Sequence, residues 1–185
     1  PIMAIFLLTS FSGRAVAGEI ELGTIELLIG RPVSRTKLFL ARYLSGISIL
    51  VTFTVVAVFS VIPLAALHGI EYQVRSFAAG ALILFLFGWV IFSMTMMFSS
   101  FFSEKSKVYM AGGGILLVMY VLNIAALMND NLELLKYFSF FHYYAFSDAV
   151  VHQTVYGAGS LVFTGVSLLC SVAGMWWFAK RDIAA

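Results

Sequence analysis

Residues 77–102 read FAAGALILFLFGWVIFSMTMMFSSFF and contain no charged side chain. A transmembrane helix needs about 20 apolar residues, whereas a transmembrane β-strand needs about 10 residues that alternate between apolar and polar. This run is too long and too evenly apolar for a barrel strand. Inside lipid only a helix or a closed barrel satisfies its own backbone hydrogen bonds. The stretch therefore predicts a membrane-spanning helix and an all-α membrane protein.

Comparable apolar runs lie on both sides of this one, at residues 43–67, 108–128 and 159–179. The 185 residues are 62% hydrophobic and 11% charged, whereas about a quarter of a soluble domain is charged. We therefore expect one transmembrane domain over residues 1–185 with four full spans. The opening residues 1–11 are about half as long as a span. We expect them to be the end of a truncated span, in the C-terminal part of a longer protein.

Lysine and arginine are distributed unevenly between the two sides that these spans define. One side carries only Arg75 and Lys136. The other side carries nine bases: Arg14, Arg31, Arg35, Lys37, Arg42, Lys105, Lys107, Lys180 and Arg181. Because bases accumulate in cytoplasmic loops, we expect a multi-pass protein of the plasma (inner) membrane. Its basic side and its C-terminus would face the cytoplasm.

The charged segment between the first two apolar runs, residues 18–42, reads GEIELGTIELLIGRPVSRTKLFLAR. On a helix over residues 17–29, Glu19, Gly23 and Glu26 fall along one stripe. A broad apolar arc of the same helix is formed by Ile20, Leu22, Ile25, Leu27, Leu28 and Ile29. Such a helix would lie in the membrane surface with its acids toward water. Gly30 and Pro32 would end it, since glycine suits a helix C-terminus and proline cannot continue the helix.

Bases follow the acids in this segment. Ser34 is the predicted N-cap of the next helix, and four bases surround that point: Arg31, Arg35, Lys37 and Arg42. Attraction to an anionic leaflet is worth about 1 kcal/mol per base, so we expect these four to anchor the span to the membrane. The acids have no such lipid partner. An exposed acidic stripe predicts a protein partner, and a merely solvated face is the alternative.

Several residues of this segment resemble the membrane subunit of type-2 ABC exporters, the permeases that pair with a separate ATPase chain. The resemblance rests on the runs Gly18-Glu19, Glu21-Leu22-Gly23-Thr24-Ile25-Glu26-Leu27-Leu28 and Arg31-Pro32-Val33-Ser34-Arg35. It extends at motif level over about residues 13–43, and the short Lys180-Arg181-Asp182 end is also similar. In that family the half-transporter has six spans, and the full spans here would be the third to the sixth.

The resemblance implies a function and a set of partners. Residues 14–30 would be a cytoplasmic coupling helix that docks on the ATPase, with Glu19, Glu21, Gly23, Thr24 and Glu26 as the contact. ATP and Mg²⁺ would bind the ATPase, and a second permease subunit would complete a homo- or heterodimer in the bilayer, with no nucleic acid involved. The chain itself would be non-catalytic. The alternative is a membrane scaffold or assembly factor that recruits another cytoplasmic protein without transporting anything.

The connection before the last span, residues 129–158, carries six aromatic residues within nine positions: Phe138, Phe140, Phe141, Tyr143, Tyr144 and Phe146. Aromatic rings favour the headgroup region, so we expect short external helices that lie on the outer leaflet or dip into it. A gate or substrate contact is the alternative. His142, Asp148 and His152 lie in the same connection and are candidate metal or proton ligands, but their spacing is not typical of a metal site.

Catalytic motifs are missing from the sequence. It contains no G-x-x-x-x-G-K-[ST], H-E-x-x-H, C-x-x-C or G-x-S-x-G, the patterns of phosphate loops, zinc hydrolases, thiol redox sites and serine hydrolases. All nine acids lie outside the predicted spans, which disfavours an ion-coupled transporter. Gly112-Gly113-Gly114 in the third full span predict close helix packing, with a hinge as the alternative. Met94, Met96 and Met97 are expected to pack in the core or to face lipid, with a soft-metal path as the alternative.

Overall fold

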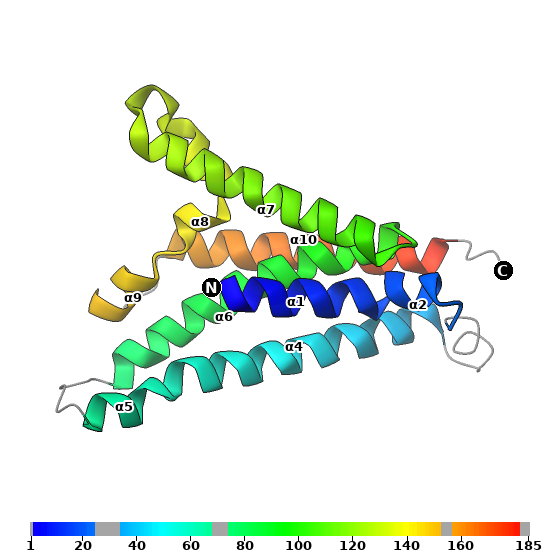
Figure 1. Ribbon diagram of the computed structural model, residues 1–185, viewed down its shortest axis with the longest axis horizontal. Coiled ribbons are helices and arrows are strands. Elements are labelled where there is room, and N and C mark those ends of the chain that lie inside the picture. Colours follow the sequence, from blue (N-terminus) through cyan, green and yellow to red (C-terminus); the bar gives the residue numbers. More distant parts are fainter. Residues whose placement is uncertain (1, 25–33, 68–73, 153–156, 182–185) are drawn as a thin grey trace.

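The computed structural model describes residues 2–24, 34–67, 74–152 and 157–181, and these residues form an all-α protein (Figure 1). Four helical segments are long and apolar enough to cross a membrane, as the sequence predicts. These are α4 with the first residues of α5, α6, α7 and α10. The elements in chain order are α1 Ile2–Ala15, α2 Ala17–Glu21, α4 Arg35–Phe59, α5 Val61–Leu67, α6 Val74–Phe101, α7 Lys105–Met128, the 3₁₀ helix η1 Asp130–Phe138, α8 Phe140–Tyr143, α9 Phe146–His152 and α10 Gly157–Lys180.

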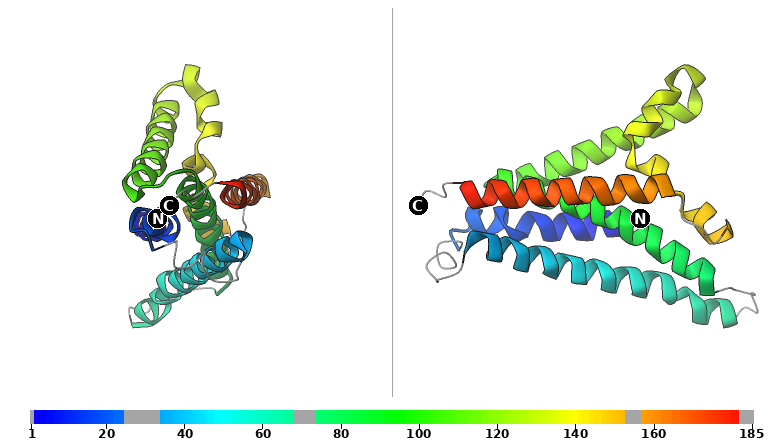
Figure 2. Two further views of the ribbon diagram at one scale, coloured as in Figure 1. Left: turned by 90° about the vertical axis from the view of Figure 1, so that its right-hand side faces the viewer. Right: turned by 180° about the vertical axis from the view of Figure 1, so that it is seen from behind.

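Helix α6, which contains the run 77–102, lies at the centre of the bundle. In the most apolar stretch of 18 residues in α6, 61% of the residues are buried. The corresponding share is 17 to 22% in the other three spanning helices. Helices α1, α4, α7 and α10 all pack against α6, as the end-on view in Figure 2 shows. The most uniformly apolar helix is therefore the core, and the other spans present much of their surface to lipid.

One end of the bundle holds the basic residues. The α1–α2 corner, the start of α4, the α6–α7 turn and the end of α10 all lie on the right in Figure 1. We call this the basic end. Its described bases are Arg14, Arg35, Lys37, Arg42, Lys105, Lys107, Lys180 and Arg181. The separation of charge predicted from the order of spans therefore agrees with the arrangement of the helices.

Helix α4 begins where the sequence predicts. The backbone of Ser34 is extended, and its hydroxyl accepts a hydrogen bond from the backbone N–H of Lys37 at 3.4 Å. This satisfies one of the N–H groups that have no partner within the first turn of a helix.

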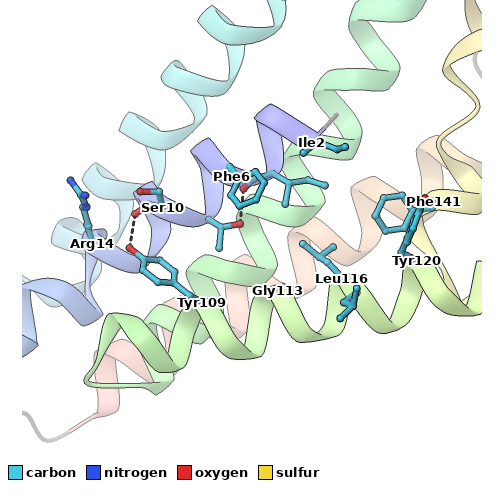
Figure 3. A pocket seen from close by; sticks show the side chains of 12 residues that line it. Ile2, Phe6, Ser10, Arg14, Tyr109, Gly113, Leu116, Tyr120 and Phe141 are labelled. Carbon is cyan, nitrogen blue, oxygen red and sulfur yellow. Dashed lines mark hydrogen bonds between the residues drawn. The ribbon is translucent and has the colours of Figure 1, made fainter.

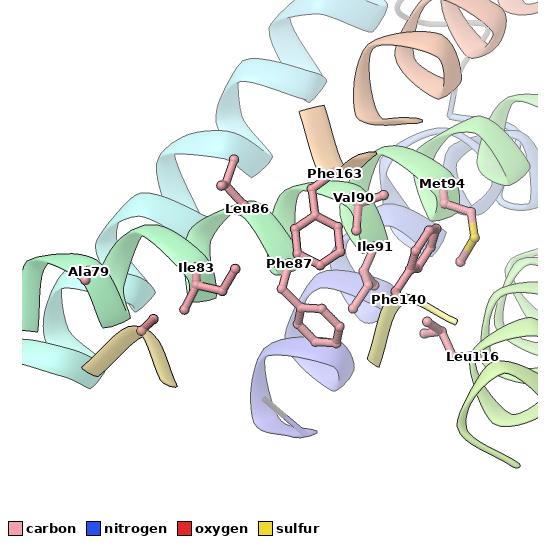
Figure 4. Close-up of a cluster of buried hydrophobic side chains, with 11 residues drawn as sticks. Ala79, Ile83, Leu86, Phe87, Val90, Ile91, Met94, Leu116, Phe140 and Phe163 are labelled. Atoms are coloured by element: carbon pink, nitrogen blue, oxygen red, sulfur yellow. The ribbon is translucent and has the colours of Figure 1, made fainter. Parts of the chain in front are cut away.

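Two aromatic clusters join the helices to α6. Near the basic end, Trp89 Nε1 donates to Tyr43 Oη at 2.7 Å, and Tyr43 Oη lies 2.6 Å from Ser93 Oγ. In the other half, the buried ring of Phe87 contacts Phe163 of α10, with ring centres 6.1 Å apart (Figure 4). Met94 and Met96 are buried in these two clusters, consistent with packing between helices.

The aromatic connection folds back into the bundle. Phe140 is buried, and the rings of Phe141 and Tyr144 lie 5.5 and 4.4 Å from that of Phe87. Phe141 also meets Tyr120 of α7, which lies eight residues before the end of that helix, or about 12 Å along its axis. The expected short helices are present as η1, α8 and α9. Their rings do not all form an interfacial belt, because several pack onto α6 and α10.

The three successive glycines of α7 differ in their surroundings. Helix α7 runs unbroken from Lys105 to Met128, so the glycines do not interrupt the helix. A Cβ on Gly112 would lie 2.8 Å from Thr95 Cγ2, whereas one on Gly113 or Gly114 would meet nothing within 4 Å. The expectation of close packing is correct for Gly112 and wrong for its two neighbours, because they lie on the faces of α7 turned away from α6.

Candidate functional site

The short helix α2 is held at the basic end by contacts to three spanning helices. Its N-cap residue, Val16, has no side chain that accepts a hydrogen bond. Instead the backbone N–H of Ala17 donates to Ser99 Oγ of α6 at 3.0 Å. Since Ala17 and Ser99 are both fully buried, this bond fixes the start of α2 against the central helix.

Glu19 connects α2 to α4. Its carboxylate forms an ion pair with the guanidinium of Arg42, and the Glu19 side chain is only 18% exposed. Burial raises the pKa of Glu19 above its ordinary 4.5, and Arg42 opposes this rise. The expectation of an acidic stripe turned toward water is therefore wrong at Glu19. Arg42, expected to anchor the span to lipid, binds this acid.

Glu21 connects α2 to α7. Its Oε2 accepts the backbone N–H of Lys105, the first residue of α7, at 2.9 Å, and Oε1 lies 3.5 Å from Lys105 Nζ. The residue at the N-cap of α7, Glu104, makes no capping bond with its own side chain. A carboxylate at a helix N-terminus is favoured by the helix dipole and by the unpaired N–H groups there. Glu21 thus caps a helix that begins 84 residues further along the chain.

Helix α2 ends in a tight turn at residues 22–24. Gly23 has φ of 69°, the left-handed conformation that glycine adopts at helix ends. Thr24 Oγ1 donates to the carbonyl of Glu19 at 3.3 Å, and the Leu22 side chain is 70% exposed. The single helix expected over residues 17–29 is therefore wrong at residues 22–24. The predicted end at Gly30 and Pro32 lies outside the described residues.

The remaining predicted residues lie on both sides of this turn. Glu26 and Arg31 fall outside the described residues. Arg35 donates to the carbonyl oxygen of Arg181, which joins the start of α4 to the end of α10. The Lys37 side chain is exposed. Of the predicted site residues, the structure thus brings Glu19, Glu21, Gly23, Thr24 and Arg42 together around α2.

Three residues of this end were not singled out from the sequence: Ser99, Lys105 and Arg181. Arg181 donates to the carbonyls of Ser100 and Phe102 at 2.9 and 3.1 Å, and to Ser103 Oγ. From the sequence, Lys105 contributed only to the count of charge, and Arg181 only to that count and to the resemblance of the C-terminal end. Their partners are at least 78 residues away along the chain, and no local pattern in the sequence indicates contacts over such separations.

The candidate ligands of the aromatic connection do not form a metal site in the described part of the chain, where no group of three His, Cys, Asp or Glu side chains comes together. The His142 ring lies between Tyr137 and Tyr143, with ring centres 5.3 and 5.1 Å away. Burial, and to a lesser degree the charge of Lys136, lowers the pKa of His142 from its ordinary 6.5. The His152 side chain lies outside the described part.

Four long apolar helices around a buried central one define a multi-pass α-helical membrane protein. Comparison of sequences is consistent with this class and gives the family: the chain belongs to the family described as "Protein of unknown function (DUF2705)", whose pattern matches residues 1–184. No curated protein and no solved structure matches the chain.

Proposed function

We propose that the protein is the membrane permease subunit of an ATP-driven exporter similar to type-2 ABC exporters. It would couple ATP hydrolysis on a separate ATPase chain to movement of a substrate across the plasma membrane. The observation that carries the proposal is the docking of α2 on three spanning helices at the basic end. The motif over residues 13–43 supports the same assignment.

The contacts of α2 supply a route by which a partner can move the membrane helices. Displacement of α2 would pull on α4 through Glu19 and Arg42, and on α7 through the cap that Glu21 provides. Its start would pull on α6 through Ser99. Ion pairs and packed helices that are shared between two arrangements are the usual carriers of coupling between distant sites.

The geometry changes the expected roles within the motif. Glu19 and Glu21 bind bases of the same chain, so in this proposal they transmit movement rather than contact the ATPase. The contact falls to the exposed turn of Leu22, Gly23 and Thr24. The Leu22 side chain is 70% exposed, so a partner that covered it would gain free energy from the burial of apolar surface.

The remaining parts of the proposal follow from the ATPase partner. ATP and Mg²⁺ bind that partner, the basic end faces the cytoplasm, and a second permease subunit completes the transporter as a homo- or heterodimer. This chain performs no catalysis of its own. The alternative, a scaffold that does not transport, shares the contact surface but needs no ATPase.

The test is co-purification of the full-length protein with a phosphate-loop ATPase, with ATP hydrolysis measured in the complex. The Leu22→Asp variant should lower ATPase binding by at least about tenfold, the factor for 1.4 kcal/mol. Leu134→Asp is the matched control, since Leu134 is 75% exposed on η1 at the opposite end. Its binding and hydrolysis should equal those of the unmodified protein.

Two outcomes would contradict this proposal. If both aspartate variants bind the ATPase equally well, the turn at residues 22–24 does not contact the ATPase. A stable partner that is lost with Leu22→Asp but hydrolyses no ATP would instead support the scaffold.

A further inference from the structure

A cavity of about 710 Å³ lies between α1 and α7. Its walls are mostly apolar and include Ile5 and Phe6 of α1, Leu116 of α7 and Phe141 of α8 (Figure 3). Known ligand sites have volumes of about 300 to 1,000 Å³ and are lined mainly by apolar side chains. The size and the lining therefore fit an apolar ligand.

The length of the cavity matches one leaflet of a bilayer. Along α1 its lining residues run from Ile2 to Arg14, a separation of 12 residues and therefore of about 18 Å on a helix that rises 1.5 Å per residue. Half of a hydrocarbon core about 30 Å thick is about 15 Å. An acyl chain that enters beside Arg14 would thus be accommodated along its length.

The guanidinium of Arg14 lies at the end of the cavity nearest the basic end of the bundle. Arg14 is exposed in the last turn of α1, and among the described residues it has no hydrogen bond or ion pair. The neighbouring acids Glu19 and Glu21 are paired with Arg42 and Lys105, so they do not neutralise it. The hydroxyl of Tyr109, also in the lining, already donates to the carbonyl of Ser10 at 3.4 Å.

We propose that this cavity binds one acyl chain of an anionic phospholipid from the leaflet at the basic end, with the lipid phosphate on Arg14. Bases near a membrane surface attract anionic lipid headgroups, and the apolar groove removes the chain from contact with other lipids. The site requires neither an ATPase nor transport, so it stands or falls independently of the proposed function.

The two unpacked glycines of α7 provide a variant and its matched control. Gly113 lines the cavity, and a Cβ added there meets no atom within 4 Å, so the larger side chain of Gly113→Trp can extend into the cavity and should fill it. Gly114 has equally open surroundings but does not line the cavity. Gly114→Trp therefore controls for the change in helix propensity and in surface. Arg14→Gln tests the charge, with the exposed Arg75→Gln at the opposite end as its control.

The measurement uses the full-length protein in nanodiscs of equal phosphatidylglycerol and phosphatidylcholine. After transfer to detergent, the lipid retained per chain is determined by native mass spectrometry. The unmodified protein should retain one phosphatidylglycerol in preference to phosphatidylcholine. Gly113→Trp should abolish this retention, and Arg14→Gln should lower it about fivefold, the factor expected for one lost base. Both control variants should retain the lipid.

Three results would overturn the inference. The first is equal retention of phosphatidylglycerol by Gly113→Trp and Gly114→Trp. The second is equal retention of the two lipids by the unmodified protein. The third uses Leu117→Cys, a residue of the cavity lining, carrying a photo-cross-linker in a Cys170→Ser background. If this probe cross-links to another polypeptide segment rather than to lipid, protein and not an acyl chain occupies the cavity.

Discussion

At the residue scale, two small residues set the boundaries of the helices that matter most. Ser34 starts α4 through a hydrogen bond within its own turn, and such a local bond can be predicted from sequence. Gly23 ends α2 with φ of 69°. Its role was missed because Gly30 and Pro32 form a stronger terminating pattern a few residues later.

Close packing at another glycine gives a prediction at this scale. Gly46 of α4 lies directly against the buried ring of Phe92, and an added Cβ would overlap that ring and approach Phe11 to 3.0 Å. Gly46→Ala should destabilise the protein by about 1 to 3 kcal/mol, the usual cost of overpacking, as measured by thermal unfolding in detergent.

The control for this prediction is Gly114→Ala in α7, where an added Cβ meets nothing within 4 Å. That variant should be unchanged or up to about 1 kcal/mol more stable, because alanine favours the helix. If both alanine variants have the same unfolding temperature, the contact between α4 and α6 at Gly46 is not close.

At the scale of elements, α2 illustrates how partners from distant parts of the chain replace local ones. Its first N–H is bound by Ser99 of α6, and its Glu21 caps α7. Helical periodicity identified an acid-bearing segment here. It could not show that Glu19 is held by Arg42, because periodicity describes one helix in isolation and this ion pair depends on how α2 and α4 cross.

The pair of Glu19 and Arg42 gives a prediction at this scale. Glu19→Arg and Arg42→Glu should each destabilise the protein, because each places like charges together in a partly buried site. The double variant, which exchanges the charges, should regain most of the loss. We expect a coupling free energy of about 0.5 to 3 kcal/mol, the range for residues in contact, from thermal unfolding of the four proteins.

Glu104, the N-cap residue of α7, and Lys107 in its first turn form the comparison pair, since both side chains are about half exposed. Exposed pairs typically contribute about 0.2 to 1 kcal/mol. The pair of Glu19 and Arg42 has no structural role if its coupling free energy is no larger than that of this surface pair. The same conclusion follows if the effects of the two single substitutions on stability are additive.

At the scale of the whole molecule, hydrogen bonds join the helices at the basic end, whereas helices diverge toward the opposite end. Arg181 binds the end of α6, and Arg35 binds the carbonyl of Arg181, so α4, α6 and α10 are joined there. Toward the other end α4 and α7 diverge in Figure 1, and α8 packs between α7 and α10. Movement of α2 would therefore act on the end where the helices are joined.

The contacts of Arg181 give the last prediction. Arg181→Gln should destabilise the protein by about 1 to 3 kcal/mol, since the partly buried bonds to the Ser100 and Phe102 carbonyls and the exposed bond to Ser103 Oγ lose their donor. Amide hydrogen exchange should also increase at residues 98–105. Lys180→Gln is the control, because the Lys180 side chain is exposed and its Nζ lies over the Trp176 ring, 4.2 Å from the ring centre. If the two variants change stability and amide hydrogen exchange equally, Arg181 does not hold the helices together at the basic end.

The sequence by itself determined the all-α class, the four spans, their alternating direction and the gathering of bases at one end. These features follow from the length of apolar runs and from the cost of placing charge or unpaired backbone groups in lipid. Tertiary structure alone decided what the charges do: Glu19 and Glu21 bind distant bases, Arg181 joins three helices, and Arg14 has no hydrogen bond or ion pair with another described residue. Such pairing depends on which helices are neighbours in space, and hydropathy carries no information about that.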